Sequence, residues 1–117
     1  MTLRWFGTVI DSHDPDRLAE FWAEALGFST VFRSDRMVAI APDAGTFPGL
    51  AFVRVVEPKT QKNRLHLDLR PDDQEYEIDR LLALGAHRQD IGQGAASWAV
   101  LSDPEGNEFC VLASWDA

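Results

Sequence analysis

The sequence has 117 residues, the length of one ordinary domain, and its 45% hydrophobic and 26% charged residues are typical of a globular protein. A formal net charge of -8 argues against nucleic-acid partners and anionic membrane surfaces, both of which require a basic face. The single cysteine, Cys110, cannot form an internal disulfide, and no apolar run approaches the ~20 residues of a membrane span. With no signal-peptide pattern at the N-terminus, these features predict a cytoplasmic protein.

Taken along the chain, the predicted elements repeat one order: a strand, a helix and three strands. The first set comprises a strand at 4–11, a helix at 14–28, and strands at 29–34, 36–42 and 49–57. The second set comprises a strand at 63–70, a helix at 72–86, and strands at 86–91, 96–102 and 107–114. Asp14 and Pro15 suit a helix start, and Gly27 and Gly85 suit helix ends. Strands grouped around two helices in this order predict an α+β fold.

Within the segment KNRLHLDLR at 62–70, residues 65–70 alternate strictly between apolar and polar side chains. The alternation places Leu65, Leu67 and Leu69 on one strand face, which we expect to pack beneath a helix. The opposite face carries His66, Asp68 and Arg70. That face is either a solvated sheet surface or the wall of a binding site. The preceding Lys-Asn-Arg (62–64) is either a basic connector or part of the entrance to such a site.

The same alternation sorts the other strands. Ala51, Val53 and Val55, like Phe109 and Val111, are expected beneath a helix. The open face then carries the residues that form the candidate ligand site: Phe52, Arg54, His66, Asp68, Trp98, Glu108 and Cys110.

Several of these residues have two interpretations. His66 is either a structural histidine or a ligand contact and general base beside Asp68. Asp68 and Arg54 are either site residues or a cross-strand ion pair. We interpret Cys110 as a packed thiol, and Trp98 as either a core anchor or a stacking surface. Trp5 and Trp22 are expected in the core.

Four segments resemble one known superfamily: DPDRLAEFWAEALGF (14–28), KNRLHLDL (62–69), RLLALGA (80–86) and DPEGNEFCVL (103–112). In these segments the chain resembles the vicinal oxygen chelate superfamily, with its glyoxalase/bleomycin-resistance fold, and in particular the small bacterial glyoxalase-like proteins. The resemblance implies a single domain, 1–117, made of two βαβββ modules at about 1–58 and 59–117. It implies a cup-shaped mixed or antiparallel sheet with the helices outside, a ligand site inside, and a homodimer.

The resemblance also places four metal-ligand positions on this chain. They fall near Gly7, at Phe52 or Arg54, at His66, and at Cys110, where metal enzymes of the superfamily usually carry glutamate. Because one matched ligand remains beside a thiol, we expect no metal cofactor; if a divalent metal binds, His66 is its predicted ligand.

The sequence therefore predicts a glyoxalase-like protein that binds a small molecule, with His66 and Asp68 as the best catalytic candidates and no reaction assigned. One alternative is a metal-dependent lyase, isomerase or ring-cleaving dioxygenase that uses His66. Another is a drug-sequestering resistance protein, for which a negative net charge suits a cationic drug.

Overall fold

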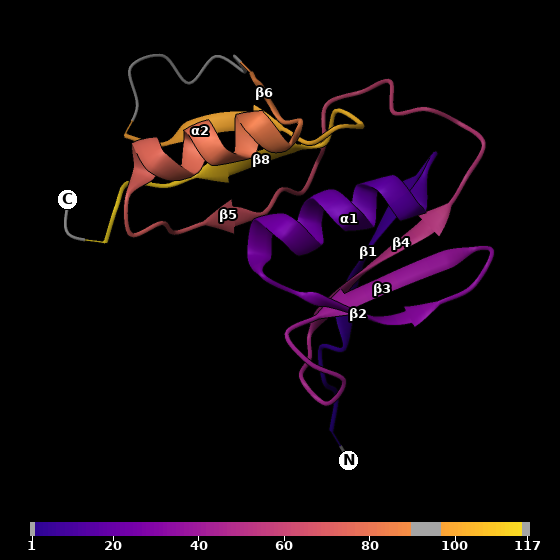
Figure 1. Cartoon of the computed structure of the whole chain (residues 1–117). Coiled ribbons are helices and arrows are strands. Elements are labelled where there is room, and N and C mark those ends of the chain that lie inside the picture. The colour runs from indigo at the N-terminus through magenta and orange to yellow at the C-terminus, as the bar shows by residue number, and fades with distance from the viewer. Residues whose placement is uncertain (1, 90–96, 116–117) are drawn as a thin grey trace. The chain divides into compact units, whose positions relative to one another are not determined.

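The computed structural model describes residues 2–89 and 97–115. Its contacts divide the chain into two compact units, 1–58 and 59–117, and each contains one helix and one four-stranded sheet (Figure 1). The predicted α+β class with two βαβββ modules is thus confirmed. That the two units form a single cup-shaped domain stays a prediction. Neither described helix is long and apolar enough to cross a membrane.

The first unit contains β1 (Gly7–Ser12), α1 (Pro15–Leu26), β2 (Ser29–Arg33), β3 (Met37–Ala41) and β4 (Gly49–Arg54). Its sheet has the order β1-β4-β3-β2, in which β1 and β4 are parallel and the other neighbours are antiparallel. The first and last strands of the unit are therefore neighbours, which is the feature of the βαβββ order that matters for the site below.

Both helices lie within their predicted ranges, α1 starts at the predicted Asp14, and both end at the predicted glycines. The Asp14 side chain accepts from the Arg17 backbone N–H at the start of α1, and Asp73 does the same for Tyr76 in α2. At the other end, Gly27 and Gly85 have φ of 69° and 120°, a backbone region that favours glycine. Capping thus follows local sequence in both units.

The core of the first unit lies between α1 and the face of β3 and β4 that α1 contacts. Phe52 is fully buried there, with Val38 as its cross-strand partner. The prediction that Phe52 faces the open side of the sheet is therefore wrong. The strand alternates in the opposite phase: Leu50 and Phe52 are buried, whereas Ala51 and Val53 are partly exposed. Residues 50–53 are all apolar, so polarity alone does not decide which face is buried. The larger side chains of Leu50 and Phe52 take the buried positions because they fill the space beneath the helix.

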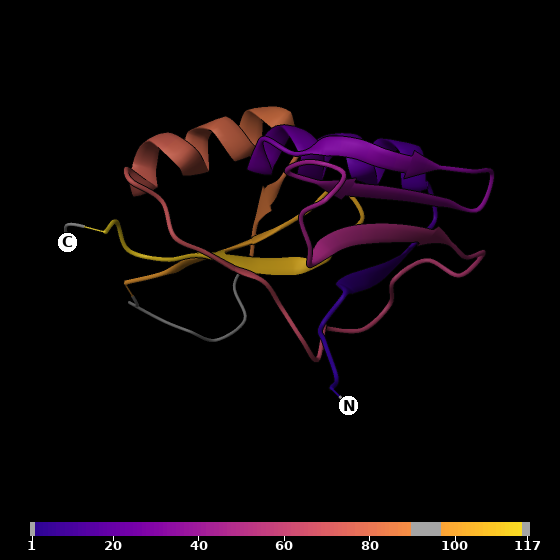
Figure 2. The same cartoon turned by 90° about the horizontal axis from the view of Figure 1, so that it is seen from below.

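The second unit contains β5 (Asp68–Leu69), α2 (Gln74–Leu84), β6 (His87–Arg88), β7 (Ala99–Ser102) and β8 (Glu108–Val111). Its order, β5-β8-β7-β6, repeats that of the first unit, again with the first and last strands parallel. Helix α2 lies along one side of this sheet (Figure 2). The predicted strands at 86–91 and 96–102 extend into residues 90–96, which lie outside the described part of the chain.

The turn between β7 and β8 is built around Asp103, which is fully buried. Its carboxylate accepts from the backbone N–H groups of Glu105 and Asn107 and from the Asn107 side-chain amide, at 2.9–3.1 Å. The Gly106 N–H closes the predicted Asp-Pro-Glu-Gly turn on the Asp103 carbonyl at 2.9 Å. This turn fixes the register of β8, and with it the position of Cys110.

The strand predicted at 63–70 is much shorter in the structure. Only Asp68 and Leu69 pair with β8, and Leu65 is 88% exposed, so the prediction that Leu65 packs beneath a helix is wrong. Leu67 and Leu69 are partly exposed. Trp5 is 68% exposed and is likewise not a core residue, whereas Trp22 is buried as predicted.

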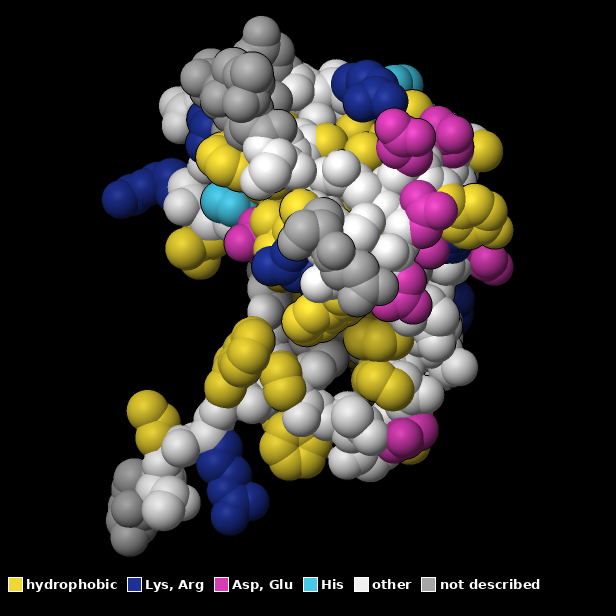
Figure 3. Space-filling view, turned by 90° about the vertical axis from the view of Figure 1, so that its left-hand side faces the viewer, with side chains coloured by type: hydrophobic (Ala, Val, Ile, Leu, Met, Phe, Trp, Pro, Cys, Tyr) yellow, Lys and Arg dark blue, Asp and Glu magenta, His cyan; other side chains and the backbone are white. Residues whose placement is uncertain are grey.

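Large hydrophobic side chains are exposed on both units, and surface hydrophobic groups are visible in Figure 3. Within each sheet as described, one pair of strands forms the edges: β1 and β2 in the first unit, β5 and β6 in the second. Such edges and apolar groups usually need cover. The predicted homodimer remains a prediction that these features support.

Candidate functional site

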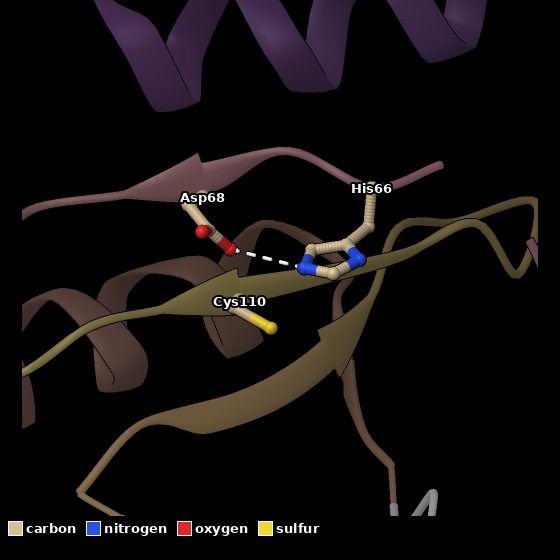
Figure 4. A group of neighbouring side chains, drawn as sticks. All are labelled: His66, Asp68 and Cys110. Carbon is tan, nitrogen blue, oxygen red and sulfur yellow. Dashed lines mark ion pairs between the residues drawn. The ribbon is translucent and has the colours of Figure 1, made fainter. Parts of the chain in front are cut away.

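The candidate site lies in the second unit, where β5 and β8 run side by side. Asp68 is paired in register with Cys110, and the Cys110 N–H donates to the Leu67 carbonyl at 2.9 Å. Residues paired across two strands point to the same face of the sheet, and so do residues two apart along one extended segment. His66, Asp68 and Cys110 are therefore brought together (Figure 4).

The three side chains form a compact group. His66 Nε2 lies 3.1 Å from Asp68 Oδ1, and one potential ligand atom from each of the three residues lies within 4.8 Å of the others. The side chains of His66 and Asp68 are 46% and 53% exposed, whereas Cys110 is buried. A carboxylate beside an imidazole orients the ring and fixes its proton on the facing nitrogen, which leaves the other nitrogen for a ligand.

Cys110 is held in its thiol form. Burial raises the pKa of the Cys110 thiol above its ordinary value, and the charge of Asp68 and a hydrogen bond with it raise the pKa further, against a smaller opposing effect of Lys62. The thiolate is the reactive form of cysteine. The residue is accordingly a packed thiol, as the sequence predicts.

We expect iodoacetamide to alkylate Cys110 about 10-fold or more slowly than free N-acetylcysteine at pH 7, because a raised pKa depletes the thiolate and burial blocks access. Mass spectrometry over time measures the rate. The alkylation rate of Cys110 should go on rising with pH beyond the pH at which the rate for free cysteine levels off. Alkylation at pH 7 as fast as that of N-acetylcysteine would contradict this description.

Glu108 belongs to a different cluster. Its carboxylate accepts from the Asn63 backbone N–H at 2.8 Å and pairs with Lys59 Nζ at 2.9 Å. Burial acts to raise the pKa of Glu108, but the hydrogen bonds from Asn63 and Lys59 and the charge of Lys59 lower it overall. Glu108 therefore anchors the segment that leads into β5. Sequence reasoning missed this role because nothing in the alternation of β8 indicates a partner 45 residues earlier.

The other predicted site residues do not join the cluster. Phe52 is buried in the first unit, and Arg54, at the end of β4, is exposed and donates from Nε to the Asp35 carbonyl at 3.2 Å. Trp98 precedes β7 and is 41% exposed. The Arg70 side chain makes no hydrogen bond or ion pair with His66 or Asp68. Its guanidinium donates to the Ala113 carbonyl at 2.8 Å and lies over the Trp115 ring.

The nitrogen, oxygen and sulfur donors of His66, Asp68 and Cys110 are a set that zinc accepts. A thiolate favours zinc and softer ions over magnesium, calcium or manganese. The three residues thus fit a borderline-soft divalent ion. Asp68 was not among the positions that the family resemblance supplied; the parallel pairing of β5 with β8 adds it.

The two βαβββ units are those that the resemblance to the glyoxalase/bleomycin-resistance fold implies. A family model described as "Glyoxalase-like domain" matches residues 7–112, so the chain belongs to the glyoxalase-like domain family. No curated protein gave a significant match.

Solved structures share the fold at low sequence identity. Leishmania major glyoxalase I has a TM-score of 0.71 at 18% identity, covering 96% of this chain and 87% of that one. An E126Q mutant of FosX, a fosfomycin resistance protein from Listeria monocytogenes, was solved with Mn(II) and 1S,2S-dihydroxypropylphosphonic acid; it has a TM-score of 0.71 at 12% identity over 97% and 92% of the two chains. A bleomycin-binding protein in complex with bleomycin has a TM-score of 0.60 at 22% identity over 92% and 96%. These similarities establish the fold.

Proposed function

We propose that the protein binds a small molecule at the cluster of His66, Asp68 and Cys110. The observation that carries this proposal is the convergence of three polar groups of different chemistry within 4.8 Å. Ligand sites typically combine a few converging polar groups with nearby apolar surface. The half-exposed His66 and Asp68 are accessible to a ligand, while the buried Cys110 forms the floor.

The chain's own residues supply the chemistry of binding. Asp68 orients the His66 ring, and the second ring nitrogen can accept a proton from a ligand or donate one to it. Asp68 lies on β5 and His66 two residues before it on the same segment, and the pairing of β5 with β8 holds this segment in place, which favours specific recognition. Proton transfer to or from a bound molecule is therefore within the capacity of this pair, although the proposal requires only binding.

We expect His66→Ala and Asp68→Ala each to weaken ligand binding about 10-fold or more while shifting the melting temperature by no more than about 3 °C. The stability effect is small because an ion pair between half-exposed side chains contributes about 0–1 kcal/mol. Thermal melts and isothermal titration with ligands from a fragment screen measure the two effects.

His87→Ala is the matched control, because His87 is also exposed and lies on β6 of the same unit. It should change neither affinity nor melting temperature. A drop of more than about 8 °C in His66→Ala or Asp68→Ala with unchanged affinity would show that the pair is structural and would overturn the proposal.

A metal-dependent enzyme is the second candidate, favoured by the donor set of the cluster. His66, Asp68 and Cys110 would hold the ion. A bound zinc ion would supply Lewis acidity and a water of lowered pKa. The FosX mutant, which shares the fold, was solved with Mn(II), but a thiol donor suits a softer ion.

Drug sequestration remains an alternative, since a bleomycin-binding protein shares the fold. Bleomycin therefore belongs in the ligand screen beside the fragments. Binding of bleomycin that survives His66→Ala and Asp68→Ala would place a drug site away from the cluster.

A further inference from the structure

A cavity of about 430 Å³ lies in the second unit, beside the segment that leads into β5. Its lining includes Lys59, Gln61 and Lys62 from that segment, Gln89 just after β6, and Glu105 and Glu108 from the β7–β8 turn and β8. Two lysines and two glutamates thus face the same space. Which charge is left for a ligand depends on how these four groups are already engaged.

Lys59 and Glu108 neutralise one another. The two lie 2.9 Å apart, and their side chains are 21% and 10% exposed. The second oxygen of Glu108 is occupied by the Asn63 N–H. This pair is built into the wall, so neither residue offers an uncompensated charge to a ligand.

Lys62 differs from Lys59 in this respect. Its ammonium makes a long hydrogen bond, 3.4 Å, to the neighbouring Asn63 carbonyl. Across residues 2–89 and 97–115, no carboxylate lies within 4 Å of it. An ammonium has three N–H donors, so Lys62 retains donors that can bind an acceptor from outside the chain.

The cavity adjoins the candidate site. Glu108 lines the cavity and Cys110 belongs to the cluster, and the two are separated by one residue on β8. One small molecule can therefore contact both regions of the second unit.

We propose that Lys62 binds an anionic oxygen group, a carboxylate or a phosphonate, of the molecule that occupies the His66–Asp68–Cys110 site. This inference rests on the proposed function and adds the class of its ligand. Lys62 supplies the charge, and Gln61 and Thr60 beside it offer neutral hydrogen-bond donors. The unexplained Lys-Asn-Arg segment thereby has two separate roles: Asn63 anchors the wall and Lys62 binds the ligand.

The test uses three phenyl compounds that differ in their head group: benzoate, the nearly isosteric but neutral benzamide, and phenylphosphonate. Titration into ¹⁵N-labelled protein should shift the amide signals of residues 60–63 with both anions, and benzamide should bind about 10-fold more weakly, because it lacks the charge-assisted hydrogen bond. A preference for benzoate or for phenylphosphonate identifies which anionic group the site favours.

Lys62→Gln should weaken both anions about 10-fold and leave benzamide unchanged. Arg64→Gln is the matched control, since it removes the same charge from an exposed residue outside the cavity lining and should have little effect. Equal affinity for benzoate and benzamide, or equal loss in Lys62→Gln and Arg64→Gln, would overturn the inference.

Failure here is distinguishable from failure of the proposed function. If neutral or cationic molecules bind in a manner that depends on His66 and Asp68 but not on Lys62, the site stands and the anionic class is wrong. If ligands bind without dependence on any of the three residues, both proposals are wrong.

Discussion

Replacing Phe52 with alanine is expected to lower the free energy of unfolding by about 3–5 kcal/mol, the usual cost of truncating a buried phenylalanine. The side chain has no solvent exposure, Val38 is its cross-strand partner, and α1 contacts its strand β4. Chemical denaturation followed by tryptophan fluorescence measures the change. This variant has the largest expected effect on stability because it opens a cavity in the core of the first unit.

Val53→Ala is the matched control on the same strand. Val53 faces the opposite side and is partly exposed, so its truncation should cost roughly 1 kcal/mol or less. The contrast between these adjacent residues tests which face of β4 is covered by the helix. A larger loss in Val53→Ala than in Phe52→Ala would restore the face assignment that sequence alternation predicts.

The largest expected effect on binding concerns Cys110 and tests the second candidate function. If the cluster takes a borderline-soft ion, Co(II) added to reduced protein should produce a thiolate-to-cobalt charge-transfer band in the near ultraviolet. Cys110→Ser should abolish that band and weaken zinc binding by about 100-fold or more. Loss of a residue that only supports a metal ligand already costs about 10–100-fold, and Cys110 would be a ligand itself. Binding should also release protons, since the thiol must lose its proton to coordinate.

Two controls accompany the cobalt titration. His87→Ala removes an exposed histidine from the same unit and should bind cobalt normally. His66→Ala should weaken binding with the band altered. A wild-type protein that shows no thiolate band at millimolar cobalt would contradict the metal-dependent candidate, and small-molecule binding without a metal would remain.

Local sequence was sufficient to predict the helices. Asp14 and Gly27 bracket α1, and Gly85 ends α2, because capping depends on groups within a few residues of the helix end. The strands were harder to predict. In β4 every residue from Leu50 to Val53 is apolar, so the face is decided by tertiary packing, and the larger Leu50 and Phe52 take the buried positions.

The candidate site was predictable in part. Alternation correctly placed His66 and Asp68 on one side, and their ion pair follows from a separation of two residues. The expected eight-residue strand was too long because β5 is an edge strand that finds a partner in β8 at Asp68 and Leu69 alone. Leu65 lies before that pairing begins, and alternation has no effect on burial where no neighbouring strand fixes a face.

The sequence already placed Cys110 among the candidate site residues, and topology explains why it lies beside Asp68. In a βαβββ unit the first and last strands are neighbours, so the second unit had to place β8 beside the histidine strand. The exact register, Asp68 opposite Cys110, depends on the Asp103 turn and on the anchoring of Asn63 by Glu108. Those long-range contacts have no signature in a single sequence. The role proposed for Lys62 likewise depends on a long-range contact, because Lys59 is already paired with Glu108 and Lys62 is not paired with a carboxylate of the described residues.

The most direct test of the account is to map a bound ligand on the ¹⁵N-labelled protein. Bleomycin and a fragment set of carboxylates, phosphonates and neutral ring compounds would be titrated into the wild-type chain and into the His66→Ala/Asp68→Ala double variant. The account predicts that the amide signals of residues 66–70 and 108–112 shift in the wild type, and that the same compounds fail to saturate the double variant. Compounds that bind both proteins equally, or that shift only signals of residues 2–58, would contradict the assignment of the binding site to this cluster.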